Sequence, residues 1–194
     1  LLSVHSAAAV VRADEPLDVG QRQRVVDAFG RFDVLVNSAA IMVRTPVGEV
    51  DAATWDRMFA LNLRAPFFLS QAAAPHLRAA RGAIVNIADL AAFETWPGYI
   101  PHGLTKAGIV QMTRALARVL APEVRVNAIA PGTVLLPDDW SEQDAARLND
   151  TTPLGRTGSP EDVASAMLFL LDSGYITGET ITVDGGRHVR GSKT

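Results

Sequence analysis

The sequence predicts a single α/β domain, residues 1–194, in which a doubly wound parallel sheet is covered by helices on both faces. Short apolar runs alternate along the chain with longer segments of helical periodicity, as in strands joined by crossover helices. The length of 194 residues suits one domain. Hydrophobic residues make up 48% of the chain and charged residues 20%, a composition typical of a globular protein with a buried core.

Strands are predicted where short, mostly apolar runs stand between turn-forming residues. The run at 32–36 leads directly into small residues at 37–40, which let another molecule approach the backbone closely. Parallel strands of this kind end at one edge of the sheet, and ligands bind at that edge. In chain order, the predicted strands are 9–13, 32–36, 83–88, 124–129 and 180–183.

Helices are predicted where apolar residues recur at the helical period. The segment 102–120 shows this pattern clearly, with Ile109 and Met112 on one face. Thr54 can cap the start of a long helix, and Ser159 is followed by a proline and two acids, a typical helix start. The predicted helices are 21–29, 54–77, 102–120, 142–148 and 159–171.

Pro66 predicts an irregular backbone inside the long helix. Proline has no N–H, so it cannot donate to the main-chain oxygen of Asn62, four residues earlier. One alternative is a bend that leaves this oxygen free to hold a water, although an interior proline costs roughly 3 kcal/mol. The other is a helix that restarts near Pro66. Both alternatives place the irregularity at Asn62.

The charge balance limits the possible partners. The formal net charge of −3 and the sequence pI of 5.8 argue against nucleic-acid binding. No apolar run reaches the ~18 residues that a membrane span requires, and no signal-peptide pattern opens the chain. We therefore expect a cytoplasmic protein with no nucleic-acid partner, no membrane partner and no metal site.

Polar residues gather at the predicted ligand-binding edge. Asn37, Asp89 and Pro131-Gly132 each follow one of the predicted strands. His102 and Lys106 stand four residues apart on the helix between them, so both lie on one helical face. A lysine there can hold the ribose hydroxyls of a bound nucleotide, although the same spacing also suits a solvated helix surface.

The ordered set of motifs resembles the classical short-chain dehydrogenase/reductase family. The matching segments span nearly the whole chain in the order of the family, and they are 32–39, 62–67, 84–87, 106–108, 124–132 and 176–186. The resemblance implies a Rossmann-type sheet and hydride transfer to or from a carbonyl, alcohol or C=N group of a small molecule. It also implies a nicotinamide cofactor, NADP or NAD, with NADPH favoured.

The resemblance also assigns site residues. Asn62 corresponds to the asparagine whose main-chain oxygen holds a relay water, and Lys106 to the lysine that binds the nicotinamide ribose. Asp14 corresponds to the acid near the adenine. The remaining cofactor contacts are expected from two stretches, beside the adenosine ribose and beside the nicotinamide, and they are Asn37, Ser38, Ala39, Pro131, Gly132 and Thr133.

Two catalytic positions depart from the family pattern. His102 stands where the family has a tyrosine, and Asp89 stands where it has a serine. An aspartate in this place resembles the pteridine reductases, a branch of the family, but the aromatic residue that sandwiches the pterin there would fall at Met42. Asp89 therefore favours a pterin-like substrate, whereas Met42 does not.

We hypothesise a proton relay through Asp89, His102 and Lys106. Ordinary tyrosine titrates near ~10 and histidine near ~6.5. A lysine cation disfavours the imidazolium form of His102, whereas the Asp89 carboxylate favours it and lets the ring donate a proton. Tyr99 is the alternative acid, and it lies three residues before His102.

Residues that select the substrate are expected in the loops beyond the strand ends, in the segment 134–152 and at Met42, Phe93, Trp96 and Tyr99. Phe93 and Trp96 can equally pack the loop that carries them. An alternative function is a catalytically impaired relative that binds a nucleotide or a protein partner. The family is usually tetrameric through paired helices, here 54–77 and 103–120, so a homo-oligomer, tetramer or dimer, is expected.

The N-terminal part departs most from the family. The family opens with a strand and a Thr-Gly-x-x-x-Gly-x-Gly loop, where the backbone approaches the cofactor pyrophosphate. Here the chain begins Leu1-Leu2, and Gly20, Gly30 and Gly48 are isolated. We expect that the first strand and this loop are missing, and that two segments of a longer chain are joined near residues 5–8.

Overall fold

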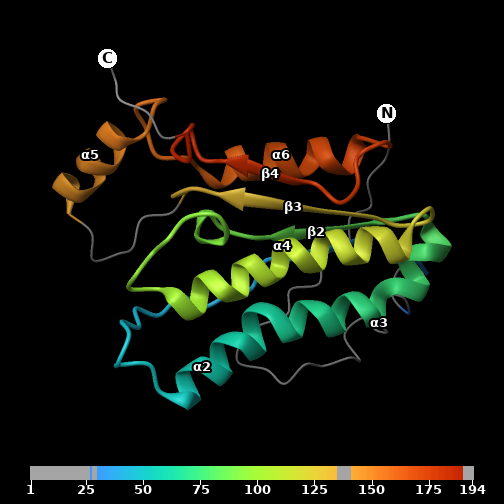
Figure 1. Cartoon of the computed structure of the whole chain (residues 1–194). Helices are drawn as coiled ribbons and strands as arrows, with labels where there is room; N and C mark the ends of the chain where they lie inside the picture. Colours follow the sequence, from blue (N-terminus) through green and yellow to red (C-terminus); the bar gives the residue numbers. More distant parts are fainter. Residues whose placement is uncertain (1–26, 28–29, 135–140, 190–194) are drawn as a thin grey trace.

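The computed structural model describes residues 27, 30–134 and 141–189. It confirms the predicted fold, a parallel sheet flanked by helices on both faces (Figure 1). The predicted strand 9–13, most of the predicted helix 21–29 and the expected join near residues 5–8 lie outside the described residues. Neighbouring strands pair in sequence order, and they are β1 (Val34–Asn37), β2 (Ala83–Ile87), β3 (Arg125–Pro131) and β4 (Thr180–Val183).

Two layers of helices enclose this sheet. Figure 1 shows α3 (Ala65–Ala80) and α4 (Ile100–Leu120) on one face, and α6 (Pro160–Asp172) on the other. The helix α2 (Ala52–Phe59) continues the line of α3, and α5 (Glu142–Thr151) lies beside the end of the sheet. Among the described residues, no helix is both long enough and apolar enough to cross a lipid bilayer.

Alternation along β2 divides the core between these two layers. Ile84, fully buried, packs with Leu77 of α3 and Val126 of β3. Val85 points to the opposite face of the sheet, since successive strand residues alternate, and it packs with Leu170 of α6. Both helix layers are therefore held by apolar contacts with neighbouring residues of one central strand.

The irregularity predicted at Asn62 is a π-helical turn, η1 (Ala60–Arg64), between α2 and α3. The backbone N–H of Ala65 donates to the oxygen of Ala60, five residues earlier. Pro66 consequently lies in the first turn of α3, where its missing N–H has no partner to lose. The predicted helix 54–77 is thus two helices with a wider turn between them, and Asn62 lies within that turn.

The predicted helix starts are correct at Ser159 and wrong at Thr54. Ser159 and Asp162 form a reciprocal capping box at the start of α6. The cap of α2 is Asp51, whose carboxylate accepts from the backbone N–H of Thr54 at 2.7 Å and from its hydroxyl at 3.1 Å. These hydrogen bonds lower the pKa of Asp51. An aspartate three residues upstream is the better acceptor because it is ionised.

A buried polar network ties the ends of β1 and β2 to the helices that cover them. The side-chain amide of Asn37 donates to Asn86 Oδ1 at 2.8 Å and to Ser70 Oγ at 3.2 Å. Asn86 in turn donates to Thr113 Oγ1 at 2.9 Å. All four side chains are buried, so these hydrogen bonds satisfy groups that water cannot reach. The network fixes the point where β1 leads into the ligand-binding edge.

Candidate active site

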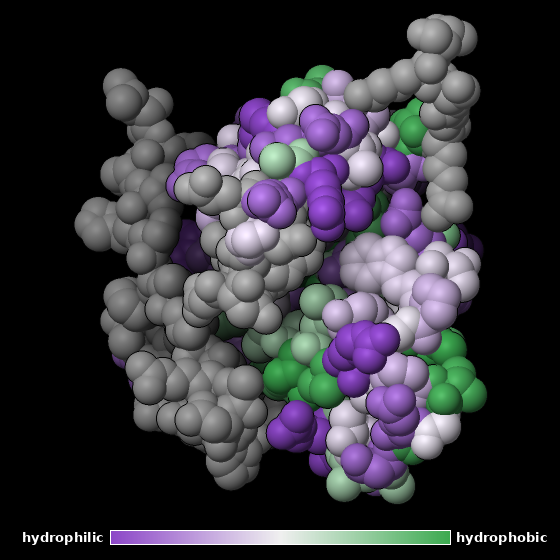
Figure 2. Space-filling model, turned by 90° about the vertical axis from the view of Figure 1, so that its left-hand side faces the viewer, coloured by the Kyte–Doolittle hydropathy of each residue, from purple (hydrophilic) through white to green (hydrophobic). Residues whose placement is uncertain are grey.

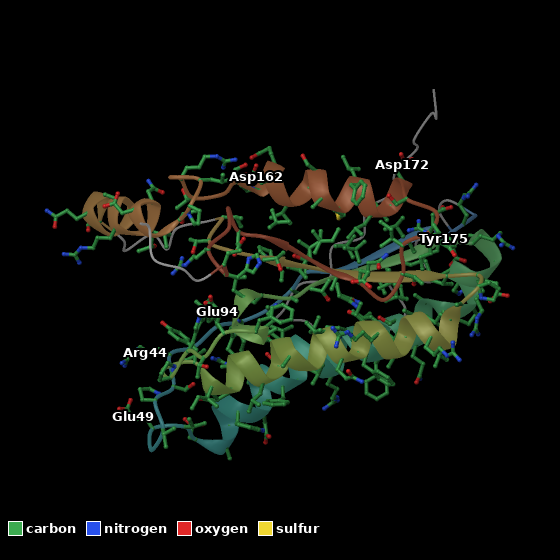
Figure 3. All side chains as sticks on the ribbon, turned by 45° about the horizontal axis from the view of Figure 1, so that its top comes forward. Arg44, Glu49, Glu94, Asp162, Asp172 and Tyr175 are labelled. Carbon is green, nitrogen blue, oxygen red and sulfur yellow. The ribbon has the colours of Figure 1, made fainter. Side chains whose placement is uncertain are left out.

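The candidate site lies at the carboxyl edge of the sheet, where α4 and α6 begin. Figure 3 shows Arg44 and Glu94, from the loops after β1 and β2, at this end with Asp162. Asp172 and Tyr175 lie at the opposite end of the molecule. Figure 2 faces the same edge and shows hydrophilic residues over much of its upper part and hydrophobic patches lower down. Loops from several elements therefore meet at one edge, as the sequence predicts.

Asn62 joins the π-helical turn to the loop that follows β1. Its side chain is 2% exposed, and its amide pairs with the main chain of Ile41 in both directions. Asn62 Oδ1 accepts from Ile41 N–H at 2.8 Å, and Asn62 Nδ2 donates to the Ile41 carbonyl oxygen at 2.8 Å. A third hydrogen bond, at 3.2 Å, reaches Thr105 Oγ1 on α4. The side chain thus fixes the loop at Ile41 against two helices.

His102 lies between two acceptors. Its Nδ1 is 3.3 Å from the Ile41 carbonyl oxygen, and its Nε2 is 3.5 Å from Asp89 Oδ2. The His102 side chain is only 3% exposed. A neutral imidazole carries one N–H, so it satisfies only one of these contacts, whereas an imidazolium donates to both. The ring therefore lies within reach of two acceptors, one from the main chain and one from a carboxylate.

Asp89 follows β2 and forms the more exposed half of this pair. Its Oδ1 accepts from the backbone N–H of Ala91 at 2.8 Å and so caps the short 3₁₀ helix η2 (Leu90–Ala92). Its side chain is 26% exposed, against 3% for His102. The carboxylate therefore faces both the buried imidazole and solvent at the carboxyl edge.

Lys106 is buried one helical turn after His102. Its ammonium donates to the Ile87 carbonyl oxygen, at the end of β2, at 2.9 Å. Burial lowers the pKa of Lys106, and the negative charge of Asp89 opposes this shift. An ammonium has three N–H bonds, and Ile87 is the one hydrogen-bond acceptor it has among the described residues. The remaining donor capacity suits the paired hydroxyls of a ribose.

The two stretches predicted to contact the cofactor lie at the same edge. Ser38 and Ala39 are exposed just after β1. Pro131 ends β3, and the backbone N–H of Gly132 donates to the Val183 oxygen at 2.9 Å. Thr133 follows directly, and its main-chain oxygen accepts from Gly158 at 3.0 Å. The remaining predicted contact, Asp14, lies outside the described residues.

The residues predicted to select the substrate lie in two loops. Met42 is 52% exposed after β1, and Phe93 is 54% exposed after β2. Trp96 packs edge-on against Tyr99, with ring centroids 6.4 Å apart, and its indole N–H donates to Glu94 at 3.0 Å. Trp96 and Tyr99 therefore have packing partners of their own. The described part of the segment 134–152 includes α5, which extends to Thr151.

Two members of this site escape sequence reasoning. The main chain of Ile41 accepts from both Asn62 and His102, yet a backbone carbonyl has no residue signature. Thr105 donates to the His102 oxygen at 2.7 Å and accepts from Asn62, and its only sequence signal is its place before Lys106. Ile41 and Thr105 therefore connect Asn62 with His102, while Asp89 contacts His102 directly and Lys106 binds the Ile87 oxygen.

The chain is similar in sequence to known proteins. Residues 14–188 match the family model described as Enoyl-(Acyl carrier protein) reductase. The 3-oxoacyl-(acyl-carrier-protein) reductase FabG of Thermotoga maritima is 37% identical over 174 residues, which cover 84% of this chain and 69% of that relative.

Solved structures show the same likeness. A short-chain dehydrogenase/reductase of the glucose/ribitol dehydrogenase type from Brucella melitensis aligns with a TM-score of 0.80 at 36% identity, covering 87% of this chain and 69% of that chain. ElxO with NADP bound aligns with a TM-score of 0.79 at 27% identity, covering 90% of this chain and 76% of that chain.

Proposed function

The chain belongs to the classical short-chain dehydrogenase/reductase family, and on this premise we propose that it transfers a hydride between NADP or NAD and a small carbonyl or alcohol substrate. The named relatives are oxidoreductases, and one similar structure holds NADP. One observation carries the proposal. At the carboxyl edge Asn62 and His102 share the Ile41 oxygen, Asp89 contacts His102, and Lys106 binds the Ile87 oxygen.

The residues at this edge fit a nicotinamide nucleotide. The buried Lys106 ammonium has donor capacity for ribose hydroxyls, and the small residues after β1 leave room for close approach. Pro131, Gly132 and Thr133 are the proposed contacts beside the nicotinamide. When bound, the nicotinamide supplies or accepts the hydride. NADPH is the preferred cofactor in this proposal, and Asp14 is its proposed contact near the adenine.

The proton is proposed to come from the Asp89–His102 pair. In reduction, the substrate oxygen gains a proton as the carbonyl carbon gains the hydride. Because His102 is almost fully buried and Asp89 is not, the proton passes from His102 Nε2 through the Asp89 carboxyl to the substrate. His102 then remains neutral, with its other proton on Nδ1 and bonded to the Ile41 oxygen. Lys106 favours release of the proton through its positive charge.

Two substrate classes are proposed, one from the name of a relative and one from a residue of the site. The name of the FabG relative favours a 3-oxoacyl compound. The aspartate at position 89 supports a pterin-like C=N substrate as the second class. Met42 provides no ring to stack on a pterin, whereas Phe93, on the next loop, presents a ring that is 54% exposed.

A second candidate function is supported by the burial of His102. With 3% of its side chain exposed, this ring cannot itself touch a substrate oxygen as an exposed phenol would. If the relay through Asp89 does not operate, the chain is a catalytically impaired relative that binds a nucleotide or a protein partner. The two functions share the fold and differ only in turnover.

One experiment separates them. NADPH and NADH are titrated into the protein, and their oxidation is followed with a panel of ketones, 3-oxoacyl esters and pterins. Substrate-dependent oxidation supports the reductase, and its loss in Lys106→Met supports the site. Nucleotide binding without turnover over the whole panel supports the impaired relative, and the absence of any nucleotide binding refutes both nucleotide-based functions.

We also propose that a second copy of this chain covers α2 and α3. A groove of about 790 Å³ runs along these helices, and its apolar lining is Phe59, Leu63, Phe67, Phe68 and Met112. Phe67 and Phe68 are 42% and 47% exposed, which suits an interface better than a core. Light scattering on Phe67→Glu should show loss of the oligomer, whereas Val47→Glu, in an exposed loop, should retain it.

A further inference from the structure

A tight turn follows β4 and is organised by one carboxylate. Asp184 Oδ1 accepts from Gly186 N–H at 2.9 Å. Asp184 Oδ2 accepts from the backbone N–H of His188 at 2.6 Å and faces its ring Nδ1 at 2.8 Å. Burial opposes the charge on Asp184, but the hydrogen bonds from His188 and Gly186 outweigh it and lower the pKa of this carboxyl. The turn is therefore held by an ionised side chain that is 3% exposed.

This turn is pressed against the end of β3. A Cβ atom at Gly132 would lie 2.8 Å from Asp184 Cβ, closer than two carbon atoms can approach. The Gly132 N–H donates to Val183, directly before the turn. Residue 132 must therefore be glycine for the turn to pack against the end of β3. The stretch 131–133 and the turn consequently form one packed unit.

Arg187 reaches from this turn to Thr133. Its Nη1 donates to Thr133 Oγ1 at 3.3 Å. Both neighbours of Arg187 donate backbone N–H groups to Asp184, so the backbone that carries the guanidinium is fixed. On its other side, Thr133 is held by Gly158 through its main-chain oxygen. Thr133 therefore has one hydrogen bond from the main chain and one from Arg187.

We propose that Arg187 is a positioning residue that holds Thr133, and through it the stretch 131–133, in the conformation that receives the nicotinamide half of the cofactor. The inference rests on the proposed function, because that function places this stretch beside the nicotinamide. Asp184 supplies the rigid base, and the Thr133 hydroxyl is the only route by which Arg187 acts. Cofactor affinity, and not the catalytic rate, is the quantity that this hydrogen bond controls.

The test measures nucleotide binding directly. NADPH and NADH are titrated calorimetrically into the wild type, Arg187→Met, Thr133→Val and the double variant. Arg187→Lys keeps a donor, so it should bind like the wild type and also guard against misfolding. Arg156→Met is the matched control, since Arg156 lies near the same turn but pairs with Asp162 at 2.8 Å.

Arg187→Met and Thr133→Val should each weaken nucleotide binding by roughly three- to tenfold, the factor that corresponds to one ordinary hydrogen bond. The double variant should be no weaker than Thr133→Val alone, because the two residues act as one pair. The cofactor KM should rise with kcat nearly unchanged, and Arg156→Met should match the wild type.

Three results would overturn this assignment. If Arg187→Met binds the nucleotide with wild-type affinity, Arg187 has no positioning role. Additive losses in the double variant mean that Arg187 contacts the cofactor itself and does not act through Thr133. If the wild type binds no nicotinamide nucleotide, the proposed function fails and the assignment fails with it. If the wild type binds the nucleotide and the variants bind it equally well, only the positioning role is overturned.

Discussion

Replacing Asn62 by aspartate tests whether its amide pairs with Ile41 as described. The new carboxyl keeps one oxygen where Asn62 Oδ1 accepts from the Ile41 N–H. Its other oxygen replaces Nδ2, which lies 2.8 Å from the Ile41 carbonyl oxygen and donates to it. Two acceptors without a proton between them repel each other. The folded Asn62→Asp variant must therefore protonate this carboxyl, which is buried like the amide it replaces.

The magnitude follows from the cost of that protonation. Holding a proton on an aspartate with an ordinary pKa of ~3.9 costs about 1.4 kcal/mol per pH unit, and therefore about 4 kcal/mol at pH 7. In a chain of this size that loss lowers Tm by roughly 8–16 °C. Because the carboxyl has a raised pKa in the folded state, the loss is small near its unfolded pKa and grows as the pH rises above it.

The assay is urea unfolding of wild type and Asn62→Asp at several pH values from 4 to 7. The difference in unfolding free energy should shrink by about 1.4 kcal/mol for each unit of acidification. Gln71→Glu adds the same charge on the exposed surface of α3 and should stay within about 0.5 kcal/mol of the wild type. Equal stability at pH 7, or a difference that does not depend on pH, would refute the pairing of Asn62 with Ile41.

Three further predictions concern other residues of the site and the core. Arg125→Met should lower the unfolding free energy by about 2–4 kcal/mol, since its guanidinium donates to two main-chain oxygens at the end of α6, at 2.6 and 2.8 Å. Urea midpoints check this, and an equal loss in the exposed Arg118→Met would contradict it. Burial lowers the pKa of Lys106, so the unfolded chain holds this proton more tightly. Wild type should therefore gain stability relative to Lys106→Met as the pH rises from the folded-state pKa toward ~10.4, and a flat difference in thermal unfolding would argue against a buried ammonium. His102→Phe should reduce turnover by roughly tenfold or more, whereas Tyr99→Phe should retain it. A pH–rate profile of both variants checks the relay, and full activity in His102→Phe would exclude it.

Much of the fold was predictable because its signals are local. Each described strand, and each of the helices α4, α5 and α6, lies within a few residues of its predicted place, since apolar runs and helical periodicity depend only on neighbouring residues. The helix start at Ser159 was predictable for the same reason. The cap of α2 was missed, because Asp51 and Thr54 are both suitable caps and only the backbone geometry selects one.

The sequence by itself determined the family, the order of the elements and the candidate side chains at the strand ends. Only the tertiary structure decided how those side chains meet. Asn62 and His102, forty residues apart in the chain, share the carbonyl oxygen of Ile41, and Arg187 reaches Thr133 across the end of the sheet. A backbone oxygen has the same chemistry in every residue, so such contacts leave no pattern in a sequence. The His102 side chain is buried and that of Asp89 is partly exposed, and this difference likewise exists only once the loops have packed.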